Sequence, residues 1–272
     1  MLELNVLFQN IGNKYTDLFF LLISYLITDI PLVLTLCFIY WCISKEKGIR
    51  MGFVLLNGMQ INFIVKDIFK VKRPYELRED IVNKDIKYGY GYSFPSNHSQ
   101  ISISFFLSLK KVFQNIKKMY PWYILVGFVG LSRIYLGVHS ILDVVCGFIL
   151  GWILVEVFYK AIDYIMNSKR YYIAYIFAVL GVIGIVFFKD EDSLKILLLY
   201  LGFLTGFIIE NRFIGYIPPK KTKNKIINYI MGIMGIVIVY TLIHGPLKYL
   251  LLGLFITLPA PYIFKLIERK VK

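Results

Sequence analysis

The chain has 272 residues, of which 58% are hydrophobic and 18% are charged, and its mean hydropathy is +0.65. A soluble protein of this length could not bury so much apolar surface in one core, so the composition predicts a membrane protein. The net charge of +14 comes from basic residues in short connections between apolar runs, with no zinc-finger spacing or basic recognition helix, which argues against nucleic-acid binding.

Apolar runs of about 20 residues, the length that crosses a bilayer, follow one another along the chain. The first stretch, 15–44, is interrupted at Thr28-Asp29-Ile30-Pro31. It crosses either twice, as a hairpin that the break favours, or once, as one long tilted helix. The later spans are 52–70, 99–117, 121–138, 141–162, 172–188, 194–211, 226–244 and 247–266. The sequence thus predicts an all-α, polytopic membrane helix bundle with ten spans, or nine if the break is only a kink.

The basic residues predict which ends of these spans face the cytoplasm. Counted along the predicted spans, the connections rich in Lys and Arg all fall on one side, which is therefore expected to be cytoplasmic. These connections contain Lys45, Lys47, Arg50, Lys110, Lys111, Lys117, Lys118, Lys169, Arg170, the stretch 212–225, Arg269, Lys270 and Lys272. The opposite side carries Asp29, the mixed-charge stretch 72–87 and the acidic Asp190-Glu191-Asp192.

The cysteines give no indication of a metal cage or a disulfide framework. Cys37, Cys42 and Cys146 all lie inside apolar runs, their number is odd, and no CxxC occurs. No carboxylate cluster suggests Mg²⁺. The sequence therefore predicts no metal and no other cofactor.

A first polar motif, Lys66-x6-Arg73-Pro74, lies at the outer end of span 52–70. On a continuous helix Lys66, Lys70 and Arg73 would share one face, and Pro74 would end that helix. Taken alone, these residues could equally be basic side chains that extend to the membrane interface.

A second motif, Phe94-Pro95-Ser96-Asn97-His98, leads directly into span 99–117. Pro, Ser and Asn are typical of helix starts, so His98 is predicted in the first helical turn. Free amide groups and the positive end of the helix dipole favour an anion there. The simpler interpretation is a helix cap with an incidental histidine.

The third motif, Ser132-Arg133-x5-His139-x3-Asp143, crosses the outer turn between spans 121–138 and 141–162. His139 and Asp143 are four residues apart, so on a helix the carboxylate could accept a hydrogen bond from the imidazole. Arg133 offers a planar fork suited to phosphate oxygens.

Together the motifs are more specific than any one of them. Two of the three histidines of the chain lie in them, and the predicted topology brings all three motifs to one membrane face. Ionisable residues at membrane depth are costly and usually functional. Three cations near two histidines indicate a site for a multiply charged anion, most simply phosphate.

The three motifs resemble those of the type 2 phosphatidic acid phosphatase (PAP2), or lipid phosphate phosphatase, superfamily, which read KxxxxxxRP, PSGH and SRxxxxxHxxxD. The resemblance covers roughly residues 15–165, and implies a PAP2-type core of six helices over 1–165. About four further transmembrane helices of unknown role follow over 166–272. Asn97 stands where the family usually has Gly.

The resemblance implies a metal-independent, two-step hydrolysis. In it His139 attacks phosphorus to form a phosphohistidine and is oriented by Asp143, while His98 protonates the leaving oxygen. The phosphate oxygens would be held by five residues: Lys66, Arg73, Ser96, Asn97 and Arg133. The Tyr/Gly-rich loop 75–95 is either a lid or an interfacial aromatic belt, and the belt is favoured.

The expected partner is a lipid phosphate taken from the cell membrane at its extracytoplasmic face. The Lys/Ile/Asn-rich composition looks bacterial, which makes undecaprenyl pyrophosphate the first candidate substrate, followed by phosphatidic acid or phosphatidylglycerophosphate. A lipid transporter or flippase is the alternative of another class. The sequence leaves open the lipid, the role of the C-terminal spans and the oligomeric state.

Overall fold

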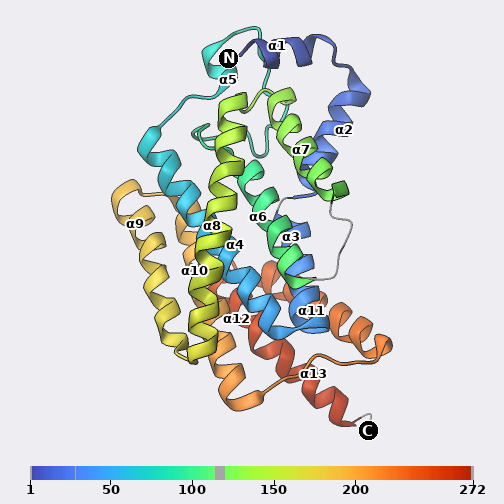
Figure 1. The fold of residues 1–272 in the computed structure, drawn as a ribbon. Coiled ribbons are helices and arrows are strands. Elements are labelled where there is room, and N and C mark those ends of the chain that lie inside the picture. The colour runs from blue at the N-terminus through green and yellow to red at the C-terminus, as the bar shows by residue number, and fades with distance from the viewer. Residues whose placement is uncertain (1, 28, 114–119, 271–272) are drawn as a thin grey trace. The chain divides into compact units, whose positions relative to one another are not determined.

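The computed structural model describes residues 2–27, 29–113 and 120–270, and within these ranges every regular element is a helix (Figure 1). The elements are α1 (Glu3–Asn10), α2 (Lys14–Tyr25), α3 (Asp29–Phe38), η1 (Ile39–Ile43), α4 (Lys45–Phe69), α5 (Pro74–Leu77), α6 (Asn97–Val112), α7 (Tyr120–Tyr135), α8 (Ile141–Ser168), η2 (Tyr171–Phe177), α9 (Ala178–Phe188), α10 (Glu191–Ile209), η3 (Glu210–Ile214), α11 (Thr222–Leu242), α12 (Leu247–Thr257) and α13 (Pro259–Lys270). The predicted all-α fold is confirmed. Thr28, Lys117, Lys118 and Lys272, which entered the predictions, lie outside the described residues.

Six helical segments of the described chain are long and apolar enough to cross a membrane. They are Lys45–Leu77, Ile141–Ser168, Tyr171–Phe188, Glu191–Ile214, Thr222–Leu242 and Leu247–Glu268. A seventh results if the pair Lys14–Tyr25 and Ile30–Ile43 forms one span. Helices α6 and α7 have 16 described residues each, about 24 Å of helix, somewhat less than a full crossing. The chain is a multi-pass membrane protein, and the total of nine or ten spans stays a prediction.

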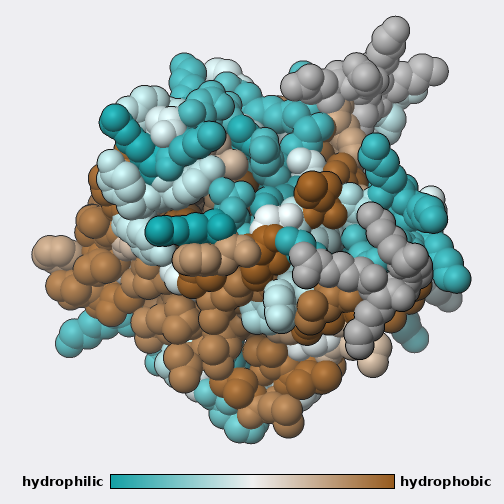
Figure 2. All heavy atoms as spheres, turned by 90° about the horizontal axis from the view of Figure 1, so that it is seen from below, coloured by the Kyte–Doolittle hydropathy of each residue, from teal (hydrophilic) through white to brown (hydrophobic). Residues whose placement is uncertain are grey.

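Apolar side chains on the outside of the helices suit a lipid environment. Large hydrophobic residues are exposed along α11, among them Ile230, Met234 and Val237. Figure 2 shows hydrophobic residues exposed side by side with hydrophilic ones on the face it presents. Such apolar surface is costly in water and favourable in a bilayer.

By contacts between its residues the chain divides into two compact units. Unit 1 comprises residues 1–32 and 61–157, and unit 2 comprises residues 33–60 and 158–272. All of the predicted site residues belong to unit 1. The predicted domain boundary at residues 165 and 166 stays a prediction.

In unit 1 two glycines let α8 pack directly against α6. A Cβ atom on Gly147 would lie 2.6 Å from the carbonyl oxygen of Ser96, and one on Gly151 would lie 2.5 Å from that of Gln100. Small residues four apart allow helix backbones in membranes to approach closely. The Ser96 amide also donates to the Asp143 carbonyl at 3.0 Å. This packing fixes the first turn of α6 against the first turn of α8.

The end of α4 differs from the prediction at Pro74. The helix ends at Phe69, Lys70 adopts a left-handed conformation with φ of 50°, and Arg73 is extended. Pro74 opens α5 instead of ending α4, because proline fits the first position of a helix and has no amide to satisfy there. The prediction that Lys66, Lys70 and Arg73 share one helical face is therefore wrong.

Unit 2 contains a buried polar cluster around Glu210. Its carboxylate accepts from Lys45 Nζ at 2.8 Å and from the Tyr216 amide at 2.5 Å. The Tyr216 hydroxyl donates to the Trp41 carbonyl at 2.7 Å, and the Trp41 indole donates to the Ile256 carbonyl at 2.8 Å. These contacts tie η1, η3 and α12 together within the unit.

Candidate active site

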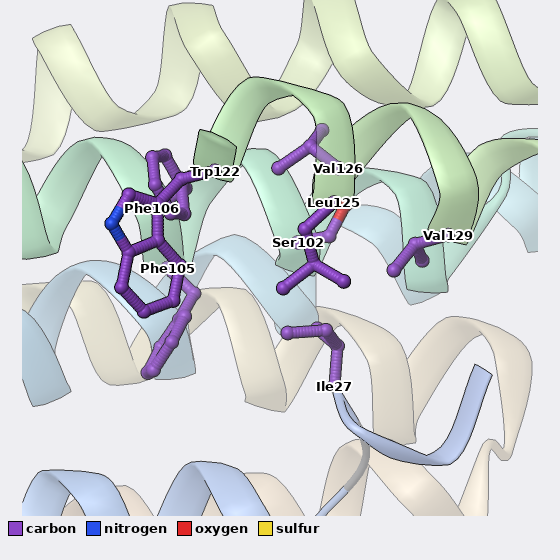
Figure 3. A pocket seen from close by; sticks show the side chains of 8 residues that line it. All are labelled: Ile27, Ser102, Phe105, Phe106, Trp122, Leu125, Val126 and Val129. Carbon is purple, nitrogen blue, oxygen red and sulfur yellow. The ribbon is translucent and has the colours of Figure 1, made fainter. Parts of the chain in front are cut away.

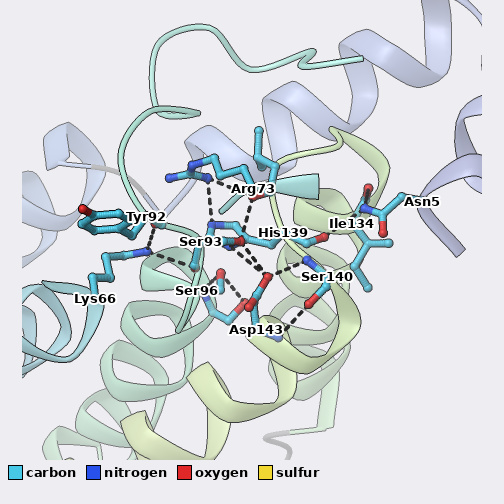
Figure 4. Close-up of polar contacts among 12 residues, drawn as sticks. Asn5, Lys66, Arg73, Tyr92, Ser93, Ser96, Ile134, His139, Ser140 and Asp143 are labelled. Atoms are coloured by element: carbon cyan, nitrogen blue, oxygen red, sulfur yellow. Dashed lines mark hydrogen bonds and ion pairs between the residues drawn. The ribbon is translucent and has the colours of Figure 1, made fainter. Parts of the chain in front are cut away.

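The centre of the site is the imidazole of His139, which is 2% exposed (Figure 4). Its Nε2 lies 3.4 Å from Arg73 Nη1, and its Nδ1 lies 3.3 Å from Ser93 Oγ. Ser93 Oγ donates to Asp143 Oδ2 at 2.7 Å, and the Ser140 amide donates to the same oxygen at 2.7 Å. With Nδ1 as the protonated nitrogen, the hydroxyl connects ring and carboxylate, and the unprotonated Nε2 accepts from Arg73 Nη1.

The expected direct hydrogen bond between His139 and Asp143 is not formed. His139 precedes α8 and lies in the turn after α7, whereas Asp143 lies in the first turn of α8. The turn is held by the amides of Val138 and His139, which donate to the Arg133 carbonyl at 3.3 and 3.2 Å. Nδ1 is 3.8 Å from Asp143 Oδ2, too far for a hydrogen bond. The helical i,i+4 argument fails because the first of the two residues is not helical.

The surroundings keep the His139 ring neutral. Burial, together with the positive charges of Arg73, Lys66 and Arg133, holds the pKa of His139 well below its usual range. A neutral ring at physiological pH is the form that can act as a nucleophile.

Arg133, on α7, is completely buried and forms an ion pair on one side only. Its Nη1 donates to Asp85 Oδ2 at 2.7 Å and to Ser24 Oγ at 2.5 Å. Its Nε and Nη2 have no hydrogen-bond partner among the described residues. These two nitrogens form the side-on edge of the guanidinium, which can donate two parallel hydrogen bonds to an oxyanion.

Lys66 and Arg73 use part of their donors on backbone carbonyls of the loop 83–93. Lys66 Nζ donates to Tyr92 O at 2.6 Å and to Ser93 O at 3.1 Å. Arg73 donates from Nε to Gly91 O at 2.9 Å and from Nη2 to Tyr90 O at 2.5 Å. A lysine has three N–H donors and an arginine five, so each keeps capacity for a further acceptor.

The first turn of α6 carries the other predicted residues. Ser96 is the N-cap, and its Oγ accepts from the Ser99 amide at 3.4 Å, so the predicted cap is confirmed. His98 is in the first turn, as predicted. His98 Nε2 and Asn97 Oδ1 are buried atoms with no hydrogen-bond partner in the part of the chain that the structure describes. The helix start therefore presents a free ring nitrogen beside a cluster of cations.

Ser93 and Asp85 were not among the predicted site residues, and Tyr88 was expected only as part of the lid or belt. All lie in the loop 83–93, outside the three motifs. Tyr88 packs edge-on against the His98 ring with centroids 5.4 Å apart, so at this position the loop contacts the site, contrary to a purely interfacial belt. The contacts of Ser93 with His139 and of Asp85 with Arg133 span 46 and 48 residues, so no local pattern indicated them.

The described residues contain no group of three or more His, Cys, Asp or Glu side chains placed to hold a metal ion. The side chains that converge instead are Lys66, Arg73 and Arg133. Such a donor set suits a polyanion and disfavours a bare cation.

An apolar pocket lies further along the same two helices, α6 and α7 (Figure 3). Phe105 and Phe106 of α6 and Val126 and Val129 of α7 line it, together with Ile27. No charged side chain contributes, so this pocket cannot bind phosphate itself. Its lining is compatible with hydrocarbon.

The chain resembles known proteins in sequence and in structure. Residues 47–167 match the model of the PAP2 superfamily, and residues 198–270 match that of the PAP2 superfamily phosphatase transmembrane extension. Lipid A 4'-phosphatase of Porphyromonas gingivalis is 32% identical over 57% of this chain and 70% of its own length. Sphingosine-1-phosphate phosphatase 1 of Mus musculus is 31% identical over 53% of this chain, which spans only 34% of that relative.

Two further likenesses are more distant in sequence. Undecaprenyl-diphosphatase BcrC of Bacillus subtilis is 26% identical over 44% of this chain and 60% of its own length. The crystal structure of LpxE from Aquifex aeolicus superposes with a TM-score of 0.50 at 26% identity, covering 58% of this chain and 94% of LpxE.

Proposed function

This chain belongs to the PAP2 superfamily, and from that premise we propose that it hydrolyses the phosphate or pyrophosphate of an amphiphilic membrane lipid. The observation that carries the proposal is the state of His139: its Nδ1 faces Ser93 and Asp143, and its Nε2 points toward Arg73. A neutral imidazole held in this way beside cations is suited to attack a phosphorus atom.

The proposed reaction has two steps. His139 Nε2 bonds to phosphorus as the bond to the lipid oxygen breaks, and His98 gives that oxygen a proton. Water, deprotonated by His98, then attacks the phosphohistidine and releases phosphate, which restores both rings. Arg133 binds two phosphate oxygens through its open edge, and Lys66 and Arg73 supply further charge; Ser96 and Asn97 complete the predicted phosphate contacts.

The positioning of His139 involves two side chains in series. Asp143 is held by the Ser140 amide and the Ser93 hydroxyl, and Ser93 contacts the ring. As the ring gains positive charge on attack, the carboxylate stabilises it through the hydroxyl. No step requires a metal, since protein cations fill the role of charge neutralisation.

Undecaprenyl pyrophosphate remains the first candidate substrate, for which the bacterial composition and the likeness to an undecaprenyl-diphosphatase are the support. Lipid phosphomonoesters are the second candidate. The names of two relatives, the lipid A 4'-phosphatase and the sphingosine-1-phosphate phosphatase, favour this class. Phosphatidic acid and phosphatidylglycerophosphate belong to it.

The test is phosphate release by the purified full chain from a panel of undecaprenyl pyrophosphate, phosphatidic acid, phosphatidylglycerophosphate, sphingosine-1-phosphate and lipid A. His139→Ala is expected to lose at least about 10⁴-fold in kcat/KM on the preferred lipid. His244→Ala is the matched control, because His244 is exposed in the connection between α11 and α12. Equal activity of wild type and His139→Ala would refute the mechanism, and no release from any lipid would favour transport or binding.

We also propose that the site opens on the extracytoplasmic face of the cell membrane. The support is the placement of the basic connections on the other side. A cysteine introduced at Glu79 is expected to react with a membrane-impermeant maleimide in intact cells, whereas one introduced at Lys223 is expected to react only after lysis. The reverse pattern would invert the topology.

A further inference from the structure

A buried carboxylate that none of the three motifs contains lies at the phosphate site. Asp85 is fully buried in the loop 83–93, and its Oδ2 accepts from Arg133 Nη1 at 2.7 Å. Its Oδ1 accepts from the Tyr88 amide at 3.3 Å. Asp85 therefore contacts both the guanidinium and the segment whose tyrosine packs on His98.

The geometry of the guanidinium shows what this contact does. Asp85 and Ser24 together occupy Nη1, whereas Nε and Nη2 have no partner within the described chain. A guanidinium is planar and rigid, so fixing Nη1 fixes the direction of the Nε–Nη2 edge. Without the carboxylate, Arg133 could rotate and use that edge for other acceptors.

The loop is built so that Asp85 stays in place. Its amide donates to Asn83 Oδ1 at 2.9 Å, and its carbonyl accepts from the Gly89 amide at 2.8 Å. The Lys84 amide donates to the Leu136 carbonyl at 3.0 Å, in the turn that carries His139. A side chain held by its own backbone contacts can orient another with little loss of entropy.

We propose that Asp85 is a positioning residue that acts through Arg133: it aims the Nε–Nη2 edge of the guanidinium at the phosphate and couples this to the placement of Tyr88 against His98. The inference rests on the proposed function, because it assigns Arg133 to the phosphate. Asp85 itself contacts neither the reacting phosphorus nor the attacking nitrogen.

The test compares Asp85→Asn with Asp80→Asn, which removes an exposed carboxylate of the same connection, where Asp80 pairs with Arg78. Two quantities are measured in the full-length protein: kcat/KM on the preferred lipid, and the Kd for inorganic phosphate from protection against thermal unfolding. Asp85→Asn is expected to lower kcat/KM about 100-fold and to raise the Kd about 10-fold. Asp80→Asn is expected to leave both within about twofold of wild type.

A double variant separates positioning from general destabilisation. If Asp85 acts through Arg133, adding Asp85→Asn to Arg133→Ala changes the phosphate Kd by less than about twofold, because the guanidinium to be aimed is gone. An equal loss in both backgrounds would overturn the proposal. So would a wild-type phosphate Kd in Asp85→Asn.

Removing one partner of a buried ion pair can prevent folding, so Ser24→Ala provides a second variant. This variant removes the other acceptor of Arg133 Nη1 and is expected to raise the phosphate Kd about threefold. If Asp85→Asn does not fold, an unchanged phosphate Kd in Ser24→Ala would overturn the proposal. Phosphate binding can be measured without lipid hydrolysis, so the positioning role of Asp85 and the proposed function can be refuted independently. A wild type that binds phosphate with these variant effects but hydrolyses no lipid would refute only the proposed function.

Discussion

Each compact unit of this protein contains an ion pair with a fully buried carboxylate, and the two pairs differ in the surroundings of the basic partner. In unit 2 Glu210 is bound by Lys45 and by the Tyr216 amide, within a cluster that ties several helices together. In unit 1 Asp85 binds only one nitrogen of Arg133, and the other two nitrogens have no partner among the described residues.

The difference indicates that the Lys45–Glu210 pair stabilises the fold, whereas the Arg133–Asp85 pair serves the site. A buried charge is costly unless it is compensated, so a closed pair such as Lys45–Glu210 is what stability requires. Leaving Arg133 Nε and Nη2 without a protein partner carries a cost in desolvation that an anion bound at this edge would offset. The same reasoning applies to His98 Nε2. We therefore expect substitutions in unit 1 to affect chemistry and those in unit 2 to affect stability.

The largest effect is expected when the carboxylate behind His139 is neutralised. Asp143→Asn keeps the shape of the side chain but removes the charge that stabilises the reacting imidazole, and kcat is expected to fall about 10⁴-fold. The measurement is the kcat of lipid hydrolysis by Asp143→Asn, after its melting temperature has been found equal to that of wild type. A fall of less than tenfold would mean that Asp143 only caps α8, through its contact with the Ser140 amide.

The matching substitution in unit 2 is Glu210→Gln. It leaves the Lys45 ammonium without its buried counter-charge, so unfolding free energy is expected to drop by about 3 kcal/mol. The kcat of the remaining folded protein is expected to stay within about twofold of wild type. Thermal unfolding in detergent and activity on the same samples would show this. A specific loss of kcat would erase the contrast between the units.

Arginine geometry offers the next comparison. Arg133→Lys keeps the charge but loses the side-on edge, and we expect kcat/KM to fall about 100-fold. Arg50→Lys in unit 2 is the matched control, because Arg50 forms a partly exposed pair with Asp163 at 2.7 Å. It is expected to change kcat/KM less than twofold. Equal effects would show that charge alone, without the fork, suffices at Arg133.

The sequence predicted well what depends on local pattern. The cap at Ser96 and the helical turn at His98 follow from side chains that satisfy free amides nearby in the chain, and the structure has both. Six of the spans predicted from length and hydropathy lie in helical segments of the described chain that are long and apolar enough to cross a membrane. The motifs were predicted to form one site, and Lys66, Arg73 and His139 lie in the same compact unit.

The failures have two causes: tertiary contacts that override a local rule, and long-range contacts that leave no local signal. Lys66 and Arg73 were placed on one helix, but the left-handed turn at Lys70 and the contacts of Arg73 with loop carbonyls take the chain out of the helix. Ser93 and Asp85 contact partners 46 and 48 residues away, and a single sequence carries no periodic signal for such contacts.

A smaller effect is expected from removing the hydroxyl between His139 and Asp143. Ser93→Ala leaves both end groups in place, 3.8 Å apart, and is expected to lower kcat about tenfold. Ser168→Ala, a serine at the end of α8 that bonds its own helix, is the control and should be silent. A loss as large as that of Asp143→Asn would mean that the hydroxyl is the whole link, and no loss would mean that the carboxylate reaches the ring unaided.

The smallest expected effect is on the pH dependence of stability. Because burial and the neighbouring cations lower the pKa of His139 in the folded state, the unfolded chain binds an extra proton between the folded pKa and about 6.5. Stability is therefore complete above about pH 6.5 and falls as the pH drops below it. His139→Asn removes this proton. Between pH 7.5 and 5.5 the unfolding free energy of wild type is therefore expected to decrease by about 1 kcal/mol more than that of His139→Asn.

Melting temperatures across this range give the two slopes, and His244→Asn is the control, because His244 is exposed. His98 is retained in both proteins, so only the part of its contribution that depends on the charge of His139 enters the difference between wild type and His139→Asn. Parallel curves for the two would mean that the His139 ring accepts a proton in the folded protein as readily as in the unfolded chain. Lys66, Arg73 and Arg133 would then not keep the His139 ring in its neutral, nucleophilic form. Their positive charge would act only on the phosphate of the substrate.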